Sequence, residues 1–67
     1  MTQLVYTVEE AAKYLKCHEQ TIYNLIRNKK LLATKVGKEW RIHKVALDGI
    51  LLGISPEEIQ KSYLEEV

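Results

Sequence analysis

The side chains with the clearest chemistry lie between residues 19 and 27, on the outward side of an expected helix. An amide of Gln or Asn can form two hydrogen bonds with adenine, and an Arg guanidinium can do so with guanine or with a phosphate. A Tyr hydroxyl can bind a phosphate, and its ring can contact the methyl group of thymine. The candidate base-contacting residues are Glu19, Gln20, Thr21, Tyr23, Asn24 and Arg27. The alternative is that they form an ordinary solvated helix face.

A second group of side chains carries positive charge and follows directly in the sequence. Its members are expected to contact phosphates, and they are Lys29, Lys30, Lys35, Lys38 and Arg41. Arg41 ranks above the lysines because a guanidinium matches the geometry of a phosphate with two hydrogen bonds. Alternatively, these charges protect the open edge of a small sheet from pairing with other chains.

The charge of the chain is distributed unevenly. Between Lys13 and Lys44 there are nine Lys or Arg residues against two acids, a local balance of +7, whereas the whole chain carries only +1. The remainder is therefore acidic. A basic stretch that is contiguous in the sequence indicates a surface for a polyanion, and this is more informative than the net charge.

The size and composition of the chain exclude several classes of protein. A chain of 67 residues makes one small domain without room for an enzyme cleft, and a single cysteine excludes an internal disulfide. No residues have the spacing of a metal site, a nucleophile with its base, or a glycine-rich phosphate loop. We therefore expect no catalysis, no cofactor and no small-molecule substrate.

Membrane insertion and export are not expected either. There is no apolar run of about 18 residues, and the first residues, MTQLVYT, lack the pattern of a signal peptide. The sequence thus predicts a cytoplasmic protein, associated with the nucleoid when it is bound to DNA.

Two helices are predicted in the first half of the chain. Thr7 and Glu10 have the spacing of a capping box, and Val8, Ala11, Ala12 and Leu15 then follow the helical period as far as about Lys16. A short connection through Cys17 leads to a second helix from about His18 to Asn28, with Ile22, Leu25 and Ile26 facing inward. Two short helices joined in this way form a helix-turn-helix.

A β-hairpin is predicted next, with strands at residues 32–36 and 39–42 around Gly37. A two-residue loop of Gly37 and Lys38 suits a type II′ turn, whereas a three-residue loop would place Val36 opposite Trp40. In either register Arg41 faces away from Trp40, because side chains alternate along a strand. Trp40 is expected in the core rather than as a platform on which bases stack.

Two further helices complete the prediction: one from about Lys44 to Leu52, ended by Gly53, and one that begins with Ser55 and Pro56. The third helix is expected to use Val45, Leu47, Ile50 and Leu51 for apolar contacts. The fold class is thus mainly α with a small β-hairpin: a winged helix-turn-helix over residues 1–53 and an acidic C-terminal helix over 54–67. The stripe of Ile59, Tyr63 and Val67 either packs on the domain or forms an assembly surface.

The run from residue 6 to residue 51, YTVEEAAKYLKCHEQTIYNLIRNKKLLATKVGKEWRIHKVALDGIL, resembles the excisionase-type, MerR-like winged helix-turn-helix domain of phage and transposon excisionases and small bacterial regulators. The matching pieces are T-V-E-E-A-A-x-Y-L, T-I-Y-x-L-I-R and K-V-G-x-x-W-R-I. The resemblance implies that the second helix enters a major groove, that the hairpin touches the backbone or the minor groove, and that no cofactor is needed. This sequence departs from the family at His18, where Ser or Thr is common, and at Lys29, where Gly is usual.

Together these observations favour sequence-specific binding of double-stranded DNA. The expected role is that of an excisionase, which sets the direction of recombination, or of a small transcriptional regulator. The partners would then be DNA, further copies of the chain on DNA, and a recombinase (integrase) or the transcription machinery. The alternative is a protein-interaction adaptor whose acidic C-terminal helix is the working surface.

Overall fold

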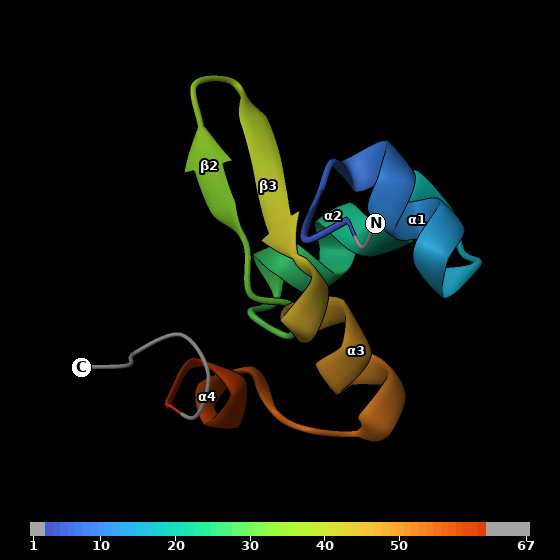
Figure 1. Ribbon diagram of the computed structural model, residues 1–67. Coiled ribbons are helices and arrows are strands. Elements are labelled where there is room, and N and C mark those ends of the chain that lie inside the picture. Colours follow the sequence, from blue (N-terminus) through green and yellow to red (C-terminus); the bar gives the residue numbers. More distant parts are fainter. Residues whose placement is uncertain (1–2, 62–67) are drawn as a thin grey trace.

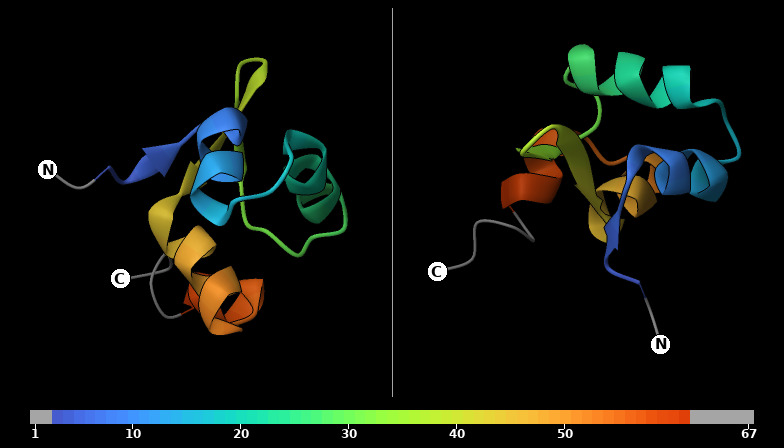
Figure 2. Two further views of the ribbon diagram at one scale, coloured as in Figure 1. Left: turned by 90° about the vertical axis from the view of Figure 1, so that its right-hand side faces the viewer. Right: turned by 90° about the horizontal axis from the view of Figure 1, so that it is seen from above.

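The computed structural model describes residues 3–61 and has the winged helix-turn-helix fold that the sequence predicts (Figure 1). A hairpin projects away from a body of packed helices, as the left view in Figure 2 shows. The elements in chain order are β1 (Val5–Tyr6), α1 (Val8–Leu15), α2 (Glu19–Arg27), β2 (Thr34–Val36), β3 (Glu39–His43), α3 (Lys44–Leu52) and α4 (Pro56–Ile59).

Helix α1 begins and ends as its local signals require. The Thr7 hydroxyl accepts from the Glu10 amide at 3.2 Å, and the Glu10 carboxylate accepts from the Thr7 amide at 2.9 Å, which completes the predicted capping box. This bond to the backbone amide of Thr7 holds the pKa of Glu10 below its usual value. The helix ends at Lys16, which adopts a left-handed conformation with φ of 58° and turns the chain toward α2.

Helix α2 shows the consequences of both departures from the family pattern. His18 occupies the N-cap position but makes no side-chain hydrogen bond there, so the first turn lacks a side-chain cap. After the helix, Lys29 adopts a left-handed conformation with φ of 60°, a region in which glycine is favoured. The chain therefore reverses after α2 through a strained backbone conformation at Lys29.

The hairpin belongs to a three-stranded antiparallel sheet with the order β1-β3-β2. In the hairpin Lys35 lies opposite Trp40 and Val36 opposite Glu39, so the loop consists of the two residues Gly37 and Lys38. Gly37 has φ of 66°, as the first loop position of a type II′ turn requires. The short strand β1, which the sequence analysis did not predict, pairs Val5 with His43 and Tyr6 with Ile42.

The core lies where α1, α2, α3 and β3 meet. Ala11, Ile22, Ile42 and Leu47 are completely buried, and Ala12 beside Ala11 is nearly so. Small residues on α1 let the second helix approach closely, and Ile22 fills the space between them. Leu25 and Ile26 are half-buried against this cluster, in agreement with their predicted inward orientation.

Helix α3 has the predicted bounds, and Gly53 ends it with φ of 78°. His43 caps its first turn, because Nδ1 accepts a hydrogen bond from the Val45 amide at 3.0 Å. The prediction that Leu51 supplies an inward contact is wrong: Leu51 is 61% exposed, and Ala46 and Gly49 are the buried residues beside Leu47. Leu51 lies on the solvent side of the last turn, one position beyond the half-buried Ile50.

Helix α4 packs on α3 through a notch made by a glycine. Ile59 is only 2% exposed, and a Cβ placed on Gly49 would lie 2.7 Å from Ile59 Cδ1, so a larger residue at position 49 would force this side chain to move. Of the predicted stripe, Ile59 thus packs on the domain and is not an exposed assembly contact. Tyr63 and Val67 lie outside the described residues.

A polar contact joins the end of α1 to α3. The Tyr14 hydroxyl donates to Asp48 Oδ1, and Lys44 Nζ lies 2.7 Å from Asp48 Oδ2. The bonds from Lys44 and Tyr14 hold the pKa of Asp48 below its usual value. The same carboxylate raises the pKa of Lys44 and of Tyr14. Asp48 therefore links two helices that flank the core.

Candidate nucleic-acid interface

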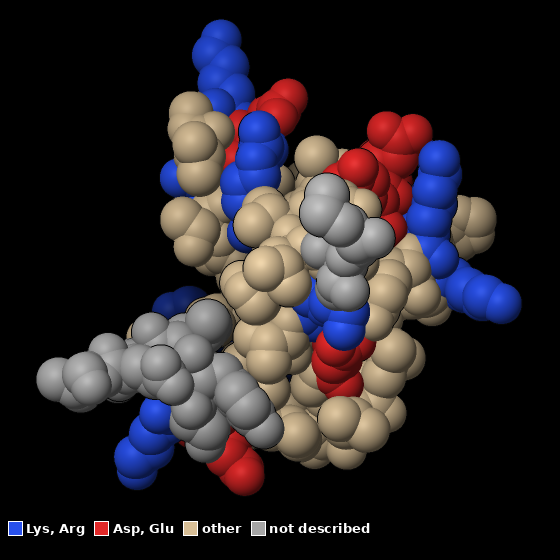
Figure 3. Space-filling model, viewed as in Figure 1, with Lys and Arg blue, Asp and Glu red and all other residues tan. Residues whose placement is uncertain are grey.

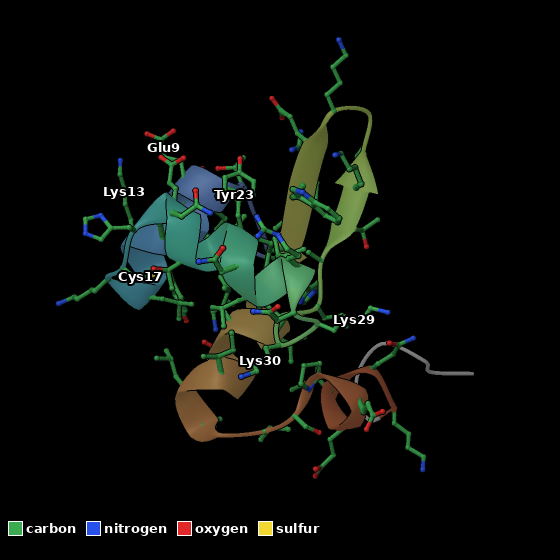
Figure 4. All side chains as sticks on the ribbon, turned by 180° about the vertical axis from the view of Figure 1, so that it is seen from behind. Glu9, Lys13, Cys17, Tyr23, Lys29 and Lys30 are labelled. Carbon is green, nitrogen blue, oxygen red and sulfur yellow. The ribbon has the colours of Figure 1, made fainter. Side chains whose placement is uncertain are left out.

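The exposed side of α2 and the inner side of the hairpin together form one surface, seen in Figure 4. A hollow of about 340 Å³, here called the hairpin hollow, lies between them and is lined by Glu9, Glu19, Tyr23, Lys35, Lys38 and Trp40 among others. In Figure 4 Tyr23 extends from α2 toward the side on which Glu9 of α1 lies. The helix and the hairpin thus present a single concave face.

A second hollow continues this face along α2. It has a volume of about 390 Å³, is here called the helix hollow, and is lined by Gln20, Tyr23, Ile26, Arg27 and Trp40. The structure therefore brings three of the predicted base-contacting residues into one depression. Asn24 is linked to them by a hydrogen bond of 3.1 Å from Gln20 Nε2 to Asn24 Oδ1.

Trp40 stands at the boundary between core and surface. It is half-buried and packs against the core, yet it also lines both hollows. Lys35, its partner across the strands, places Nζ 5.2 Å from the centre of the indole ring, a cation–π contact. Trp40 was expected inside, and its partial exposure follows from its position on a hairpin that extends beyond the helices.

Lys35 and Lys38 line the hairpin hollow, whereas Arg41 does not. Along β3 the side chain of Arg41 alternates with that of Trp40, so Arg41 lies on the other face of the sheet from Trp40. Its Nη1 pairs with Glu39 Oε1 at 2.9 Å. Arg41 is thus held in an ion pair, and its phosphate contact stays a prediction, like those of the lysines.

Lys29 and Lys30 do not belong to the hairpin. They lie in the turn after α2, as Figure 4 shows, and Lys29 lines a third hollow together with Pro56 and Glu57 at the start of α4. Both lysines are exposed, and they extend the positive charge beyond the end of the α2 face that carries Arg27.

Ion pairs separate the basic residues into two sets. Lys13, Arg41 and Lys44 pair with Glu9, Glu39 and Asp48. The other basic residues between positions 13 and 44 make no ion pair with any residue in the range 3–61; these are Lys16, Arg27, Lys29, Lys30, Lys35 and Lys38. The side shown in Figure 3, from which α2 is turned away, has acidic and basic side chains interspersed rather than a patch of one sign.

Glu9 is a residue of this surface that the sequence analysis did not predict, because its position depends on how α1 meets the hairpin. It is already paired with Lys13 at 3.9 Å. Across residues 3–61 no three His, Cys, Asp or Glu side chains are grouped as metal ligands would be. In the same range no helix has both the length and the apolar character that a membrane crossing demands.

Comparison with known proteins identifies the family of this chain. Residues 5–49 match the model of the family described as "Helix-turn-helix domain". Two proteins from Mycobacterium tuberculosis, of strains CDC 1551 / Oshkosh and H37Rv, are 38% identical to this chain over 50 residues, and each is named "Putative DNA-binding protein". The match covers 75% of this chain and 63% of each relative. No solved structure matches significantly. The chain belongs to the helix-turn-helix domain family.

Proposed function

We propose that this protein binds double-stranded DNA in a sequence-dependent manner, with α2 in a major groove and the hairpin against the backbone. The observation that carries the proposal is the joint surface: Tyr23 of α2 lines one hollow with Lys35 and Lys38 of the hairpin, and another with Arg27. The candidate base-contacting side chains thus lie close to cations that make no ion pair with any residue in the range 3–61, and both could meet the same duplex. The name of the mycobacterial relatives supports the same class of ligand.

Within this surface the two elements have different tasks. Arg27 and its neighbours on α2 present hydrogen-bonding groups to base edges, which carry the sequence information. Lys35 and Lys38 contact phosphates, which hold the protein in register but are the same for every sequence. Lys29 and Lys30 extend the phosphate contacts beyond α2.

We further propose that the protein acts in the cytoplasm as an accessory factor on DNA, either an excisionase that works with a recombinase or a small regulator of transcription. One recognition helix distinguishes only a few base pairs, so such a protein gains selectivity when copies bind side by side. Selection of bound duplexes from a random library would test this arrangement. An inverted repeat would indicate a symmetric dimer, and direct repeats would indicate copies arranged in series.

The decisive test of DNA binding is its dependence on salt. If each protomer neutralises roughly four to six phosphates, the logarithm of affinity should fall against the logarithm of salt concentration with a slope of about −4 to −5. Fluorescence anisotropy of a labelled duplex measures this directly. A slope near zero would overturn the proposal.

A pair of variants then tests the division of tasks. Arg27→Ala should lose about 1–3 kcal/mol on the selected site and less on random DNA, whereas Lys38→Ala should weaken both about equally. Lys61→Ala, beyond α4, is a control that removes a cation outside this surface. Equal losses for Arg27→Ala on both duplexes would show that the α2 face does not contact bases.

A further inference from the structure

Two amide side chains on the exposed face of α2 are already bonded to each other. Gln20 Nε2 donates to Asn24 Oδ1 at 3.1 Å. The two residues are one turn apart, which brings their side chains together on the helix surface. Both residues are exposed, so the bond joins groups that are otherwise free to meet a ligand.

This bond determines which polar atoms remain available. After it forms, Gln20 retains its Oε1 acceptor and Asn24 retains the two N–H donors of Nδ2. Turning over one amide alone would place two acceptors or two donors against each other. Turning over both restores the bond and again leaves one acceptor and one donor group. In either arrangement the pair keeps one acceptor and one donor group for a ligand.

Among the four bases, only adenine offers both a donor and an acceptor on its major-groove edge. Adenine offers N6–H as a donor and N7 as an acceptor, whereas guanine offers two acceptors, O6 and N7. The acceptor of the amide pair would form a hydrogen bond with adenine but would face O6 of guanine without a proton between them. The neighbouring Arg27 cannot replace it, because a guanidinium has donors only.

We propose that Gln20 and Asn24 act together as a single reader of adenine in an A·T pair. This inference rests on the proposed DNA binding, and it names the base that this part of the surface recognises. It also requires that the two residues act as a unit, since each holds the amide of the other in place.

The test uses the wild-type protein and its selected site, in which one adenine is replaced by guanine. The ratio of the two affinities should favour adenine by about tenfold or more. Gln20→Ala and Asn24→Ala should each remove most of this ratio, and the double variant should lose no more than either single variant. Arg27→Ala is the matched control, because it lowers the affinity for both sites and leaves the ratio unchanged. Thermal melting should show that every variant is folded, since both amides lie on an exposed helix face.

Three results would overturn the inference while leaving DNA binding intact: a selected site without a preferred adenine, an unchanged ratio in both single variants, or losses that add in the double variant. Additive losses would mean two independent contacts rather than a unit. Failure of the proposed function itself has a different signature, which is the absence of salt-dependent affinity for any duplex; that result would overturn both.

Discussion

The ammonium nitrogen of Lys35 lies 5.2 Å from the centre of the Trp40 ring. The two residues are direct partners across the hairpin, and the two-residue loop sets this register. The ring face attracts the cation and limits the positions that the long lysine side chain can take. Because Trp40 is anchored against the core, it fixes the direction in which this charge is held, and the proposed phosphate contact would use that direction.

Replacing this cation should therefore affect binding more than folding. Lys35→Met retains the aliphatic stem but removes the charge, so the salt slope should become less steep by about 1, equally on selected and random duplex. The free energy of unfolding should fall by only about 0.5 kcal/mol, as for a cation–π contact at an exposed site. Anisotropy at several salt concentrations and urea denaturation measure the two effects. An unchanged slope would place Lys35 outside the interface.

The contact between α4 and α3 gives a prediction about stability. Ile59→Ala should reduce the free energy of unfolding by about 2–4 kcal/mol, because Ile59 is nearly fully buried against Gly49. Leu52→Ala is the control: Leu52 is 74% exposed, so its replacement should change stability by no more than about 0.5 kcal/mol. Urea denaturation of the two variants measures both changes in the free energy of unfolding. If Ile59→Ala instead left stability intact and abolished self-association, Ile59 would be an assembly contact.

The strained turn after α2 gives a prediction of opposite sign. Lys29→Gly should raise the free energy of unfolding by about 0.5–1 kcal/mol, since glycine adopts positive φ without steric cost. Lys30→Gly removes the same charge from the neighbouring position, which has an ordinary φ, and should lower stability by about 0.5 kcal/mol. Both variants should weaken DNA binding to the same extent. Equal stability changes in the two variants would contradict the assignment of strain to Lys29.

The link through Asp48 predicts a dependence on pH. The pKa of Asp48 in the folded protein lies below its ordinary value of 3.8, so its stabilising contribution is complete above that value. It is lost as pH falls through the lowered folded value. At the alkaline end, Tyr14 and Lys44 have pKa values raised above 10.0 and 10.5, so their contributions are lost as pH rises past the folded values.

The variant Asp48→Asn isolates this link. The difference in free energy of unfolding between wild type and variant should be constant around neutral pH and should shrink in strong acid. Glu9→Gln is the control, because Glu9 forms only an exposed pair with Lys13 at 3.9 Å, which should contribute little at any pH. A difference for Asp48→Asn that stays constant into strong acid would contradict the assignment.

The helices could be predicted well because their limits depend on local chemistry. Thr7 with Glu10, Gly53 and Ser55 are signals that act within one turn, and the structure shows each of them in its predicted role. The same residue type can nevertheless differ in use: His43 accepts a hydrogen bond at the start of α3, whereas His18 at the start of α2 does not. The sequence pattern around the two histidines does not distinguish them.

What could not be predicted depends on contacts between distant segments. The loop around Gly37 suits two registers, and the pairing of Lys35 with Trp40 shows which one forms. The membership of Glu9 in the surface follows from the way α1 meets the hairpin. The charge pattern of the sequence groups all the basic residues between positions 13 and 44 together, although the structure pairs three of them with acidic residues.

The pairing of β1 with β3 has a consequence for the order in which the chain folds. The contact of α1 with α2 and the hairpin both join neighbouring segments, so each can form rapidly. Val5 pairs with His43, which is far from it in the sequence. Bringing the two together closes a long loop at an entropic cost, and this cost is offset only when β3 has already formed. We therefore expect this strand to join after the rate-limiting step, so that weakening it accelerates unfolding and leaves the folding rate nearly unchanged.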